Sequence, residues 1–278
     1  MTRAAMVGLG LLAVLCPQTE GAAQSGGRPI RVAVIGGMTE TGMWEGVARM
    51  FTDRSGYRVE LVATGQRPEL AEALREGRVD LLTMHSGDIT TRLAADGYGE
   101  NLRAWAMNDL VILGPESDPA GIGGLRDGVE AFRRIAEAEA NFVDVQAIGP
   151  REVAHSLWQQ AGIKPMGAWL LKDECVRERE ILRWAAQRNA YVIKGRIPVV
   201  TEKLAPAPGM RIMVEQDPAM RRPYVVLTAN PASFPDANVH GARLLSDFLL
   251  SEAVQTFLAH FDGGVGDGVP LFHPVAGT

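Results

Sequence analysis

The sequence has few cysteines, no long hydrophobic run and no concentration of charge of one sign. Its 278 residues include only two cysteines, Cys16 and Cys175, so a disulfide framework cannot hold the fold together. The apolar stretch 4–16 is shorter than the roughly 20 residues that cross a bilayer as a helix. The 28 basic and 33 acidic residues are interspersed, which excludes the basic surface typical of nucleic-acid binding. The five histidines show no metal-ligand spacing, so we expect no metal site and no cofactor.

The first residues have the pattern of a secretory signal peptide. Arg3 precedes the apolar stretch, and Gly21-Ala22-Ala23 supplies the small residues of a cleavage site. Residues 1–23 are therefore predicted to be removed during export, and the mature protein is predicted to be periplasmic or otherwise extracytoplasmic. Cleavage would leave Cys175 as a single thiol, so the exported chain has to be stabilised by its core.

Short apolar runs alternate with amphipathic runs through residues 64–122, a pattern typical of an α/β fold with a wound sheet. Residues 30–35 predict a buried strand, Gly36-Gly37 a turn, and Thr41 the N-cap of a helix. Further strands are predicted at 57–63, 81–82 and 110–113, with a helix around 70–74. These elements predict one sheet flanked by helices.

A second lobe is predicted to begin after Pro115. Helices are expected at 125–140, 152–161 and 176–188, and strands at 142–145, 191–194 and 211–214; a strand at 224–227 and helical structure over 239–260 return the chain to the first lobe. The predicted domains are residues 28–113 (lobe 1, first part), 114–214 (lobe 2) and 215–278 (return to lobe 1). Two crossings, near 113–115 and 214–223, permit a hinge.

Candidate binding groups lie where predicted strands end. Backbone N–H groups of Gly36, Gly37 and Met38 and the hydroxyls of Thr39 and Thr41 could hold an oxyanion at a helix start. The alternative is that the glycines only make a turn and Thr41 only caps the helix. His85 and Ser86 follow the third strand and should face the same region, although a histidine there could instead bond a nearby loop.

Several segments resemble a known family. They are 64–66, 79–85, 108–115, Ser117-Asp118-Pro119-Ala120-Gly121-Ile122, Ser156-Leu157-Trp158-Gln159-Gln160-Ala161-Gly162-Ile163, Asn230-Pro231 and Pro270-Leu271-Phe272-His273-Pro274. In this order they are similar to the tungstate-binding extracytoplasmic solute receptors of ABC importers. The resemblance implies a two-lobed periplasmic-binding-protein-like fold with a ligand cleft between the lobes. It also implies a monomer that binds a small anionic ligand and delivers it to a membrane permease and its ATPase.

The ligand motifs of that family are largely replaced. Receptors of this kind carry a Thr-Thr-Thr-Ser run where this chain has Val34-Ile35-Gly36-Gly37, and a Ser-Arg-Gly-Asp…Ser-Gly-Thr-His segment where it has 144–151. Of the second segment Gly149 remains, and Arg151 could supply the counter-charge. Lys172 and Arg196 fall in loops where the family places further cleft residues. A small organic acid, held by Arg151 or Arg196 and by apolar groups such as Met38 and Trp44, fits these residues as well as tungstate does.

Two other functions are compatible with parts of the sequence. A ligand sensor that signals to a membrane partner would have the same fold as an import receptor. A hydrolase could be imagined from Cys175 with His155, but no flanking signature of a catalytic cysteine is present, so we expect no enzyme activity.

Overall fold

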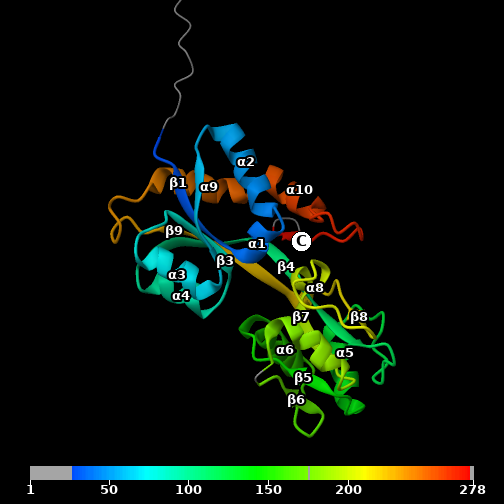
Figure 1. Ribbon diagram of the computed structural model, residues 1–278. Coiled ribbons are helices and arrows are strands. Elements are labelled where there is room, and N and C mark those ends of the chain that lie inside the picture. The colour runs from blue at the N-terminus through cyan, green and yellow to red at the C-terminus, as the bar shows by residue number, and fades with distance from the viewer. Residues whose placement is uncertain (1–26, 175, 276–278) are drawn as a thin grey trace, which may run out of the picture.

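The computed structural model describes residues 27–174 and 176–275 and arranges them as two lobes (Figure 1). The predicted signal peptide and Cys175 lie outside the described residues. One buried apolar cluster is built from residues 30–106 and 224–272, joined by Ile197, and a second from residues 110–220. The chain therefore leaves lobe 1 near residue 110 and returns to it near residue 220.

Lobe 1 contains a mixed sheet. Its strands are β1 (Ile30–Ile35), β2 (Val59–Gly65), β3 (Leu81–His85), β4 (Gly99–Pro115), β9 (Arg221–Ala229) and β10 (His273–Pro274), in the order β10-β4-β9-β3-β1-β2. β1 runs parallel to β2 and β3, whereas β9 is antiparallel to both β3 and β4. β1, β2 and β3 thus form the parallel part of the sheet. β9, which brings the chain back from lobe 2, runs in the opposite direction.

Six helices flank this sheet in the described part of lobe 1. They are α1 (Gly36–Glu40), α2 (Met43–Ser55), α3 (Arg67–Arg75), α4 (Asp88–Ala95), α9 (Val239–Leu249) and α10 (Glu252–His260). α2 lies with α9 on one side of the sheet, and α3 lies with α4 on the other (Figure 1). α2 buries Met43, Trp44, Val47 and Phe51 along one stripe, as the spacing predicts. Gly56, with φ 72°, ends it in the left-handed conformation that favours glycine.

Lobe 2 holds shorter elements around an aromatic core. Its elements are α5 (Gly128–Glu137), β5 (Phe142–Asp144), α6 (Ile148–Gln160), β6 (Leu170–Lys172), η1 (Glu178–Glu180), α7 (Ile181–Ala186), β7 (Val192–Gly195), α8 (Arg196–Val200), β8 (Met210–Val214) and η2 (Pro218–Met220). The rings of Phe132, Phe142, Trp158 and Trp169 pack against one another. In place of the single helix predicted at 176–188, the structure has two short ones, η1 and α7.

β4 is one continuous strand that belongs to both lobes. It pairs with β9 as far as Asp109, opposite Arg221, and with β7 from Leu110, opposite Gly195. Figure 1 shows it running from the upper lobe into the lower one. The prediction of a strand only at 110–113 was too short, because polar residues such as Asn101 and Asn108 interrupt the apolar pattern in its first half. Backbone pairing with β9 maintains the strand despite them.

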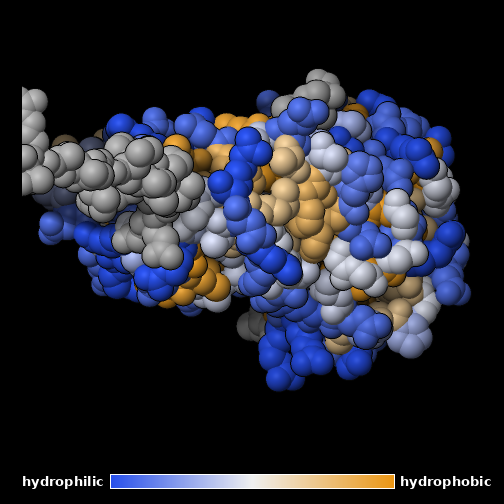
Figure 2. All heavy atoms as spheres, turned by 90° about the horizontal axis from the view of Figure 1, so that it is seen from above, coloured by the Kyte–Doolittle hydropathy of each residue, from blue (hydrophilic) through white to orange (hydrophobic). Residues whose placement is uncertain are grey.

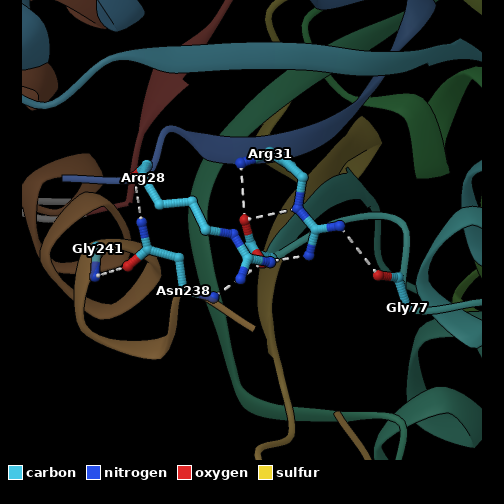
Figure 3. Close-up of polar contacts among 6 residues, drawn as sticks. Arg28, Arg31, Gly77, Asn238 and Gly241 are labelled. Carbon is cyan, nitrogen blue, oxygen red and sulfur yellow. Dashed lines mark hydrogen bonds and ion pairs between the residues drawn. The ribbon is translucent and has the colours of Figure 1, made fainter. Parts of the chain in front are cut away.

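A buried carboxylate ties the start of lobe 1 to its end. Asp80 accepts hydrogen bonds from the backbone N, Nε and Nη2 of Arg31 and from the backbone N of Asn238, at 2.9, 3.1, 2.7 and 3.0 Å. The Asn238 side chain donates to Arg28 O and accepts a hydrogen bond from Gly241 N (Figure 3). β1, β3 and the start of α9 are thereby fixed together.

The surface of lobe 1 seen from above is mostly hydrophilic, with separate hydrophobic patches between the polar residues (Figure 2). This matches the interspersed charges of the sequence. No helix among residues 27–174 and 176–275 is long and apolar enough to cross a membrane.

Candidate functional site

Four strands end where the lobes meet, and each leads into a helix. β1 is followed by α1 and β3 by α4 in lobe 1, while β5 leads to α6 and β7 to α8 in lobe 2. Polar groups beyond the carboxyl ends of such strands form the binding sites of many α/β proteins. The predicted site residues fall at these ends, although the structure does not bring all of them together.

The glycine and threonine segment forms α1 instead of an open turn. Gly36 and Gly37 are its first residues, and the Thr39 hydroxyl contacts Thr64 Oγ1 at 2.8 Å. Thr41 ends α1 instead of starting the next helix, and its hydroxyl donates to Gly37 O at 2.9 Å. The N-cap prediction for Thr41 was therefore wrong: the cap of α2 is Gly42, whose φ of 76° suits glycine. Met38 is fully buried in the core of lobe 1 and offers no surface to a ligand.

His85 and Ser86 lie at the end of β3, next to the crossing strands. His85 Nε2 donates to the Asn108 side-chain oxygen at 3.2 Å, and its ring packs on Tyr224 with 4.1 Å between centroids. Burial, with Arg222 and Arg67 nearby, holds the pKa of His85 well below its usual range, so the ring is neutral at pH 7. The backbone N–H of Ser86 donates to Pro223 O at 3.0 Å. The end of β3 is thus held against the start of β9.

The three predicted cations have different surroundings. Arg151, in the first turns of α6, donates to the Gln146 side chain at 3.2 Å. Lys172 is exposed at the end of β6 and lies 3.9 Å from Glu174. Arg196 is buried, bonded to Asp267 and 3.6 Å from Glu215, so acidic residues of the protein already surround it. None of these contacts joins the three cations to one another.

Arg222, which is not among the predicted site residues, lies at the junction of the lobes. It is near the start of β9, opposite Asn108, and its side chain is only 11% exposed. A Cβ at Gly149 would collide with its Nη1 and lie 2.8 Å from its Cζ. Glycine in the first turn of α6 therefore lets a guanidinium rest against the helix backbone. The adjacent pair Arg221-Arg222 at the predicted second crossing was the available signal for this residue.

Two more charged residues complete a cluster around Arg222. Glu152 Oε2, on α6, lies 3.3 Å from Arg222 Nη2. A Cβ at Gly87 would lie 3.2 Å from Arg67 Nη1 and 4.0 Å from Glu152 Oε1, so Arg67 borders the same space from α3. Burial, and then repulsion from Arg67, lowers the pKa of Arg222. We call these three residues the Arg67–Glu152–Arg222 cluster.

The hydroxyl of a buried tyrosine lies near the cluster. Tyr224 is 1% exposed, and its hydroxyl lies 3.9 Å from where a Cβ of Gly37 would sit. Burial raises the pKa of this phenol, so the hydroxyl remains a neutral donor. Its place next to α1 and near Arg222 makes it a candidate donor to a ligand.

Ion pairs connect the lobes around this region. Lys203 of lobe 2 bonds both carboxylate oxygens of Glu40 at 2.6 and 2.7 Å. Arg196, at the start of α8, reaches Asp267 of the C-terminal segment, and its neighbour Ile197 packs into the core of lobe 1. Asp109 binds Arg221 and His273 where β4 changes partner, at 3.1 and 2.6 Å. The Glu40–Lys203 and Arg196–Asp267 pairs therefore link the two lobes.

The donor set matches an anion and not a metal ion. Guanidinium groups, a hydroxyl and backbone N–H groups are ligands for oxygen anions. No three His, Cys, Asp or Glu side chains converge as metal ligands in the part of the chain that the structure describes.

Comparison with known proteins identifies the family. Residues 30–261 match the family of bacterial extracellular solute-binding proteins. The chain is 28% identical over 249 residues to a putative ABC transporter anion-binding protein of Haloferax volcanii, covering 85% of this chain and 69% of that protein. It is 27% identical over 252 residues to the tungstate-binding protein TupA of Peptoclostridium acidaminophilum, covering 89% and 86%.

Solved structures agree with this result. The tungstate-binding protein TupA from Desulfovibrio alaskensis G20 superposes with a TM-score of 0.74 at 26% identity, covering 89% of this chain and 99% of that one. The solved structure of the tungstate ABC transporter from Geobacter sulfurreducens has the same fold, with a TM-score of 0.67 at 23% identity, covering 84% and 98%. The two-lobed periplasmic-binding-protein-like architecture expected from the resemblance is thereby confirmed. The chain belongs to the family of bacterial extracellular solute-binding proteins.

Proposed function

We propose that this protein is the extracytoplasmic receptor of an ABC-type importer and captures a small oxyanion, of the tungstate or molybdate kind, between its lobes. The observation that carries the proposal is Arg222, a nearly buried guanidinium where lobe 1 meets α6. A buried cation requires a compensating anion, and Glu152, its ion-pair partner, is half exposed. Relatives named as anion-binding and tungstate-binding proteins support the same ligand class.

The proposed binding groups come from both lobes. Lobe 1 contributes Arg222, the Tyr224 hydroxyl and Ser86, with backbone N–H groups of the first turn of α1. Lobe 2 contributes the backbone at Gly149, in the first turn of α6. A ligand that touches both sets favours the closed arrangement by its differential affinity, which is how hinge closure follows binding.

A small organic acid is the second candidate ligand. Ile148, the first residue of α6, is a large apolar side chain that is half exposed beside Gly149. An apolar group next to a guanidinium suits a carboxylate with a hydrocarbon part.

Thermal unfolding of the mature chain with candidate ligands tests the proposal. Tungstate, molybdate, sulfate, phosphate and a panel of small carboxylic acids would be compared. A ligand at 100 times its dissociation constant stabilises the folded state by about 2.7 kcal/mol. For a chain of this size, that raises the midpoint by roughly 5–10 °C. A shift with an organic acid alone would select the second candidate, and no shift with any anion would refute both.

The cation assignment is tested with a matched pair of variants. Arg222→Gln is expected to weaken anion binding at least about tenfold, since a charge-assisted bond at a nearly buried site contributes about 1.5–3 kcal/mol. Arg151→Gln removes the same charge from the same region, where the side chain bonds Gln146, and is expected to change affinity much less. The reverse order in isothermal titration calorimetry would reinstate Arg151 as the counter-charge.

A further inference from the structure

Residues 196–204, which we call the α8 segment, contact both lobes although they lie within lobe 2 in the sequence. Ile197 is 5% exposed and belongs to the core of lobe 1, and Val200 packs against the same core. Val199 packs against the core of lobe 2, and Leu204 is part of it. Figure 1 shows α8 at the top of the lower lobe, where that lobe meets the upper one. The α8 segment is therefore a third link between the lobes, besides the two crossings of the chain.

Ion pairs hold the same segment against lobe 1. The Arg196 side chain is 2% exposed; its Nη2 donates to Asp267, and its Nε lies 3.6 Å from Glu215 in the second crossing. Arg196 Nε and Nη1 have no hydrogen-bond partner in the described part of the chain, so Asp267 is the main acidic partner of this buried cation. Lys203 bonds both carboxylate oxygens of Glu40 in α1. The segment is thus bound to lobe 1 near both of its ends.

The contacts of Arg196 and Ile197 involve none of the proposed binding groups, so they can form with or without an anion in the site. The lobes can move apart only if the α8 segment separates from one of them. β7 leads directly into the segment and pairs with β4 as far as Gly195, opposite Leu110. We therefore expect the segment to stay with lobe 2 when the lobes open, and to leave lobe 1.

We propose that the α8 segment holds the lobes together before the anion binds, so that its release from lobe 1 limits both the entry and the exit of the anion. This inference rests on the proposed oxyanion-binding function. It makes Arg196 and Ile197 positioning residues, which act on binding through the arrangement of the lobes without touching the ligand.

The proposal predicts how the rates and the affinity change together. The anion enters and leaves while the lobes are apart, and a contact that is equally strong in the empty and the loaded closed forms slows both steps by the same factor. The dissociation constant then stays nearly the same, as long as the closed form predominates. A contact that stabilised only the loaded form would instead slow dissociation alone and raise the affinity.

Two variants weaken the contacts of the segment with lobe 1 in different ways, and stopped-flow fluorescence with tungstate measures their rates. Asp267→Asn keeps the oxygen that accepts from Val269 N but removes the charge next to Arg196; we expect the association rate to rise at least about tenfold. Ile197→Val removes one methylene from the core contact and should raise association and dissociation alike, by about two- to tenfold. The control Asp236→Asn makes the same charge change in the exposed loop before α9, and should leave both rates within about twofold.

Small-angle X-ray scattering tests the empty protein directly. The wild type should have the same radius of gyration with and without tungstate, whereas Asp267→Asn should be more extended without tungstate and contract when it is added. A wild type that contracts on adding tungstate would overturn the inference and leave oxyanion binding intact. So would an unchanged association rate in either variant, or a rise in the dissociation rate alone in Ile197→Val.

Failure of the proposed function gives a different result. If tungstate binds none of the four proteins, the oxyanion assignment fails, and the scattering of the unliganded proteins still decides on the α8 segment. A more extended Asp267→Asn, with Asp236→Asn like the wild type, would support its role in holding the lobes together. Equal radii of gyration for all of them would refute that role.

Discussion

Replacing Asp80 by asparagine should destabilise lobe 1 without touching the interlobe site. The Asp80 carboxylate is fully buried and accepts four hydrogen bonds, three from Arg31 and one from Asn238. Asparagine has nearly the same shape but no charge, and its amide group would direct N–H donors at the donors of Arg31. Breaking a buried ion pair on one side costs about 3–5 kcal/mol, and the lower value applies here because Arg31 is 25% exposed.

A loss of about 3 kcal/mol corresponds to a decrease in the melting temperature of roughly 6–12 °C for a chain of this size. Circular dichroism melts of the mature wild type, Asp80→Asn and Asp53→Asn measure it. Asp53 is exposed on α2, so the same chemical change there should move the midpoint by no more than about 2 °C. Equal melting temperatures for the two variants would refute the reasoning.

The pH dependence provides a second measurement on the same variant. Burial acts to raise the pKa of Asp80, but the hydrogen bonds and charge of Arg31, with the bond from Asn238, outweigh it and lower the pKa. The stabilisation is therefore complete above the pKa of an unfolded aspartate, about 3.9, and is lost as the pH falls through the lower folded pKa. The difference in unfolding free energy between wild type and Asp80→Asn should stay constant near pH 7 and shrink below about pH 4. A difference that grows in acid would contradict the assigned cause.

Two further variants separate binding from stability. Gly149→Ala improves helix propensity by up to about 1 kcal/mol, but its Cβ displaces the Arg222 guanidinium; we expect anion affinity in calorimetry to fall while the melting temperature changes little. Tyr224→Phe removes one hydroxyl and keeps the ring that packs on His85, so the unliganded protein should lose no more than about 1 kcal/mol, whereas anion affinity should fall several-fold. A large loss of stability in the phenylalanine variant would show that the hydroxyl is structural.

The elements with strong apolar periodicity were predictable from the sequence. β1, for example, was predicted at its observed bounds. α4 and the full length of β4 were missed, because their residues are too polar to give a clear period. Thr41 was misassigned because a hydroxyl that ends one helix resembles one that starts the next. Local pattern determines these elements only where packing and backbone pairing agree with it.

The site was less predictable than the fold. The strand ends near Gly37, His85 and Gly149 could be selected from the sequence, because they follow apolar runs or match a family segment. Arg67, Glu152 and Arg222 come from α3, α6 and β9, far apart in the chain, and each resembles an ordinary surface charge until the lobes are assembled. Their significance comes from burial and from the space left by Gly87 and Gly149.

The Asp80 network also determines the order in which the lobes can be completed. Asn238 is 158 residues away from Asp80, whereas the core of lobe 2 is a single continuous stretch, residues 110–220. As the chain emerges during synthesis or export, lobe 2 has all its core residues before the strand and helices that complete lobe 1 are available. Contacts between distant segments form late, because closing a long loop costs entropy first. The contacts that hold β1 in place are therefore completed only when the segment around Asn238 is available. A chain cut after residue 220 would contain the core of lobe 2 but not that of lobe 1.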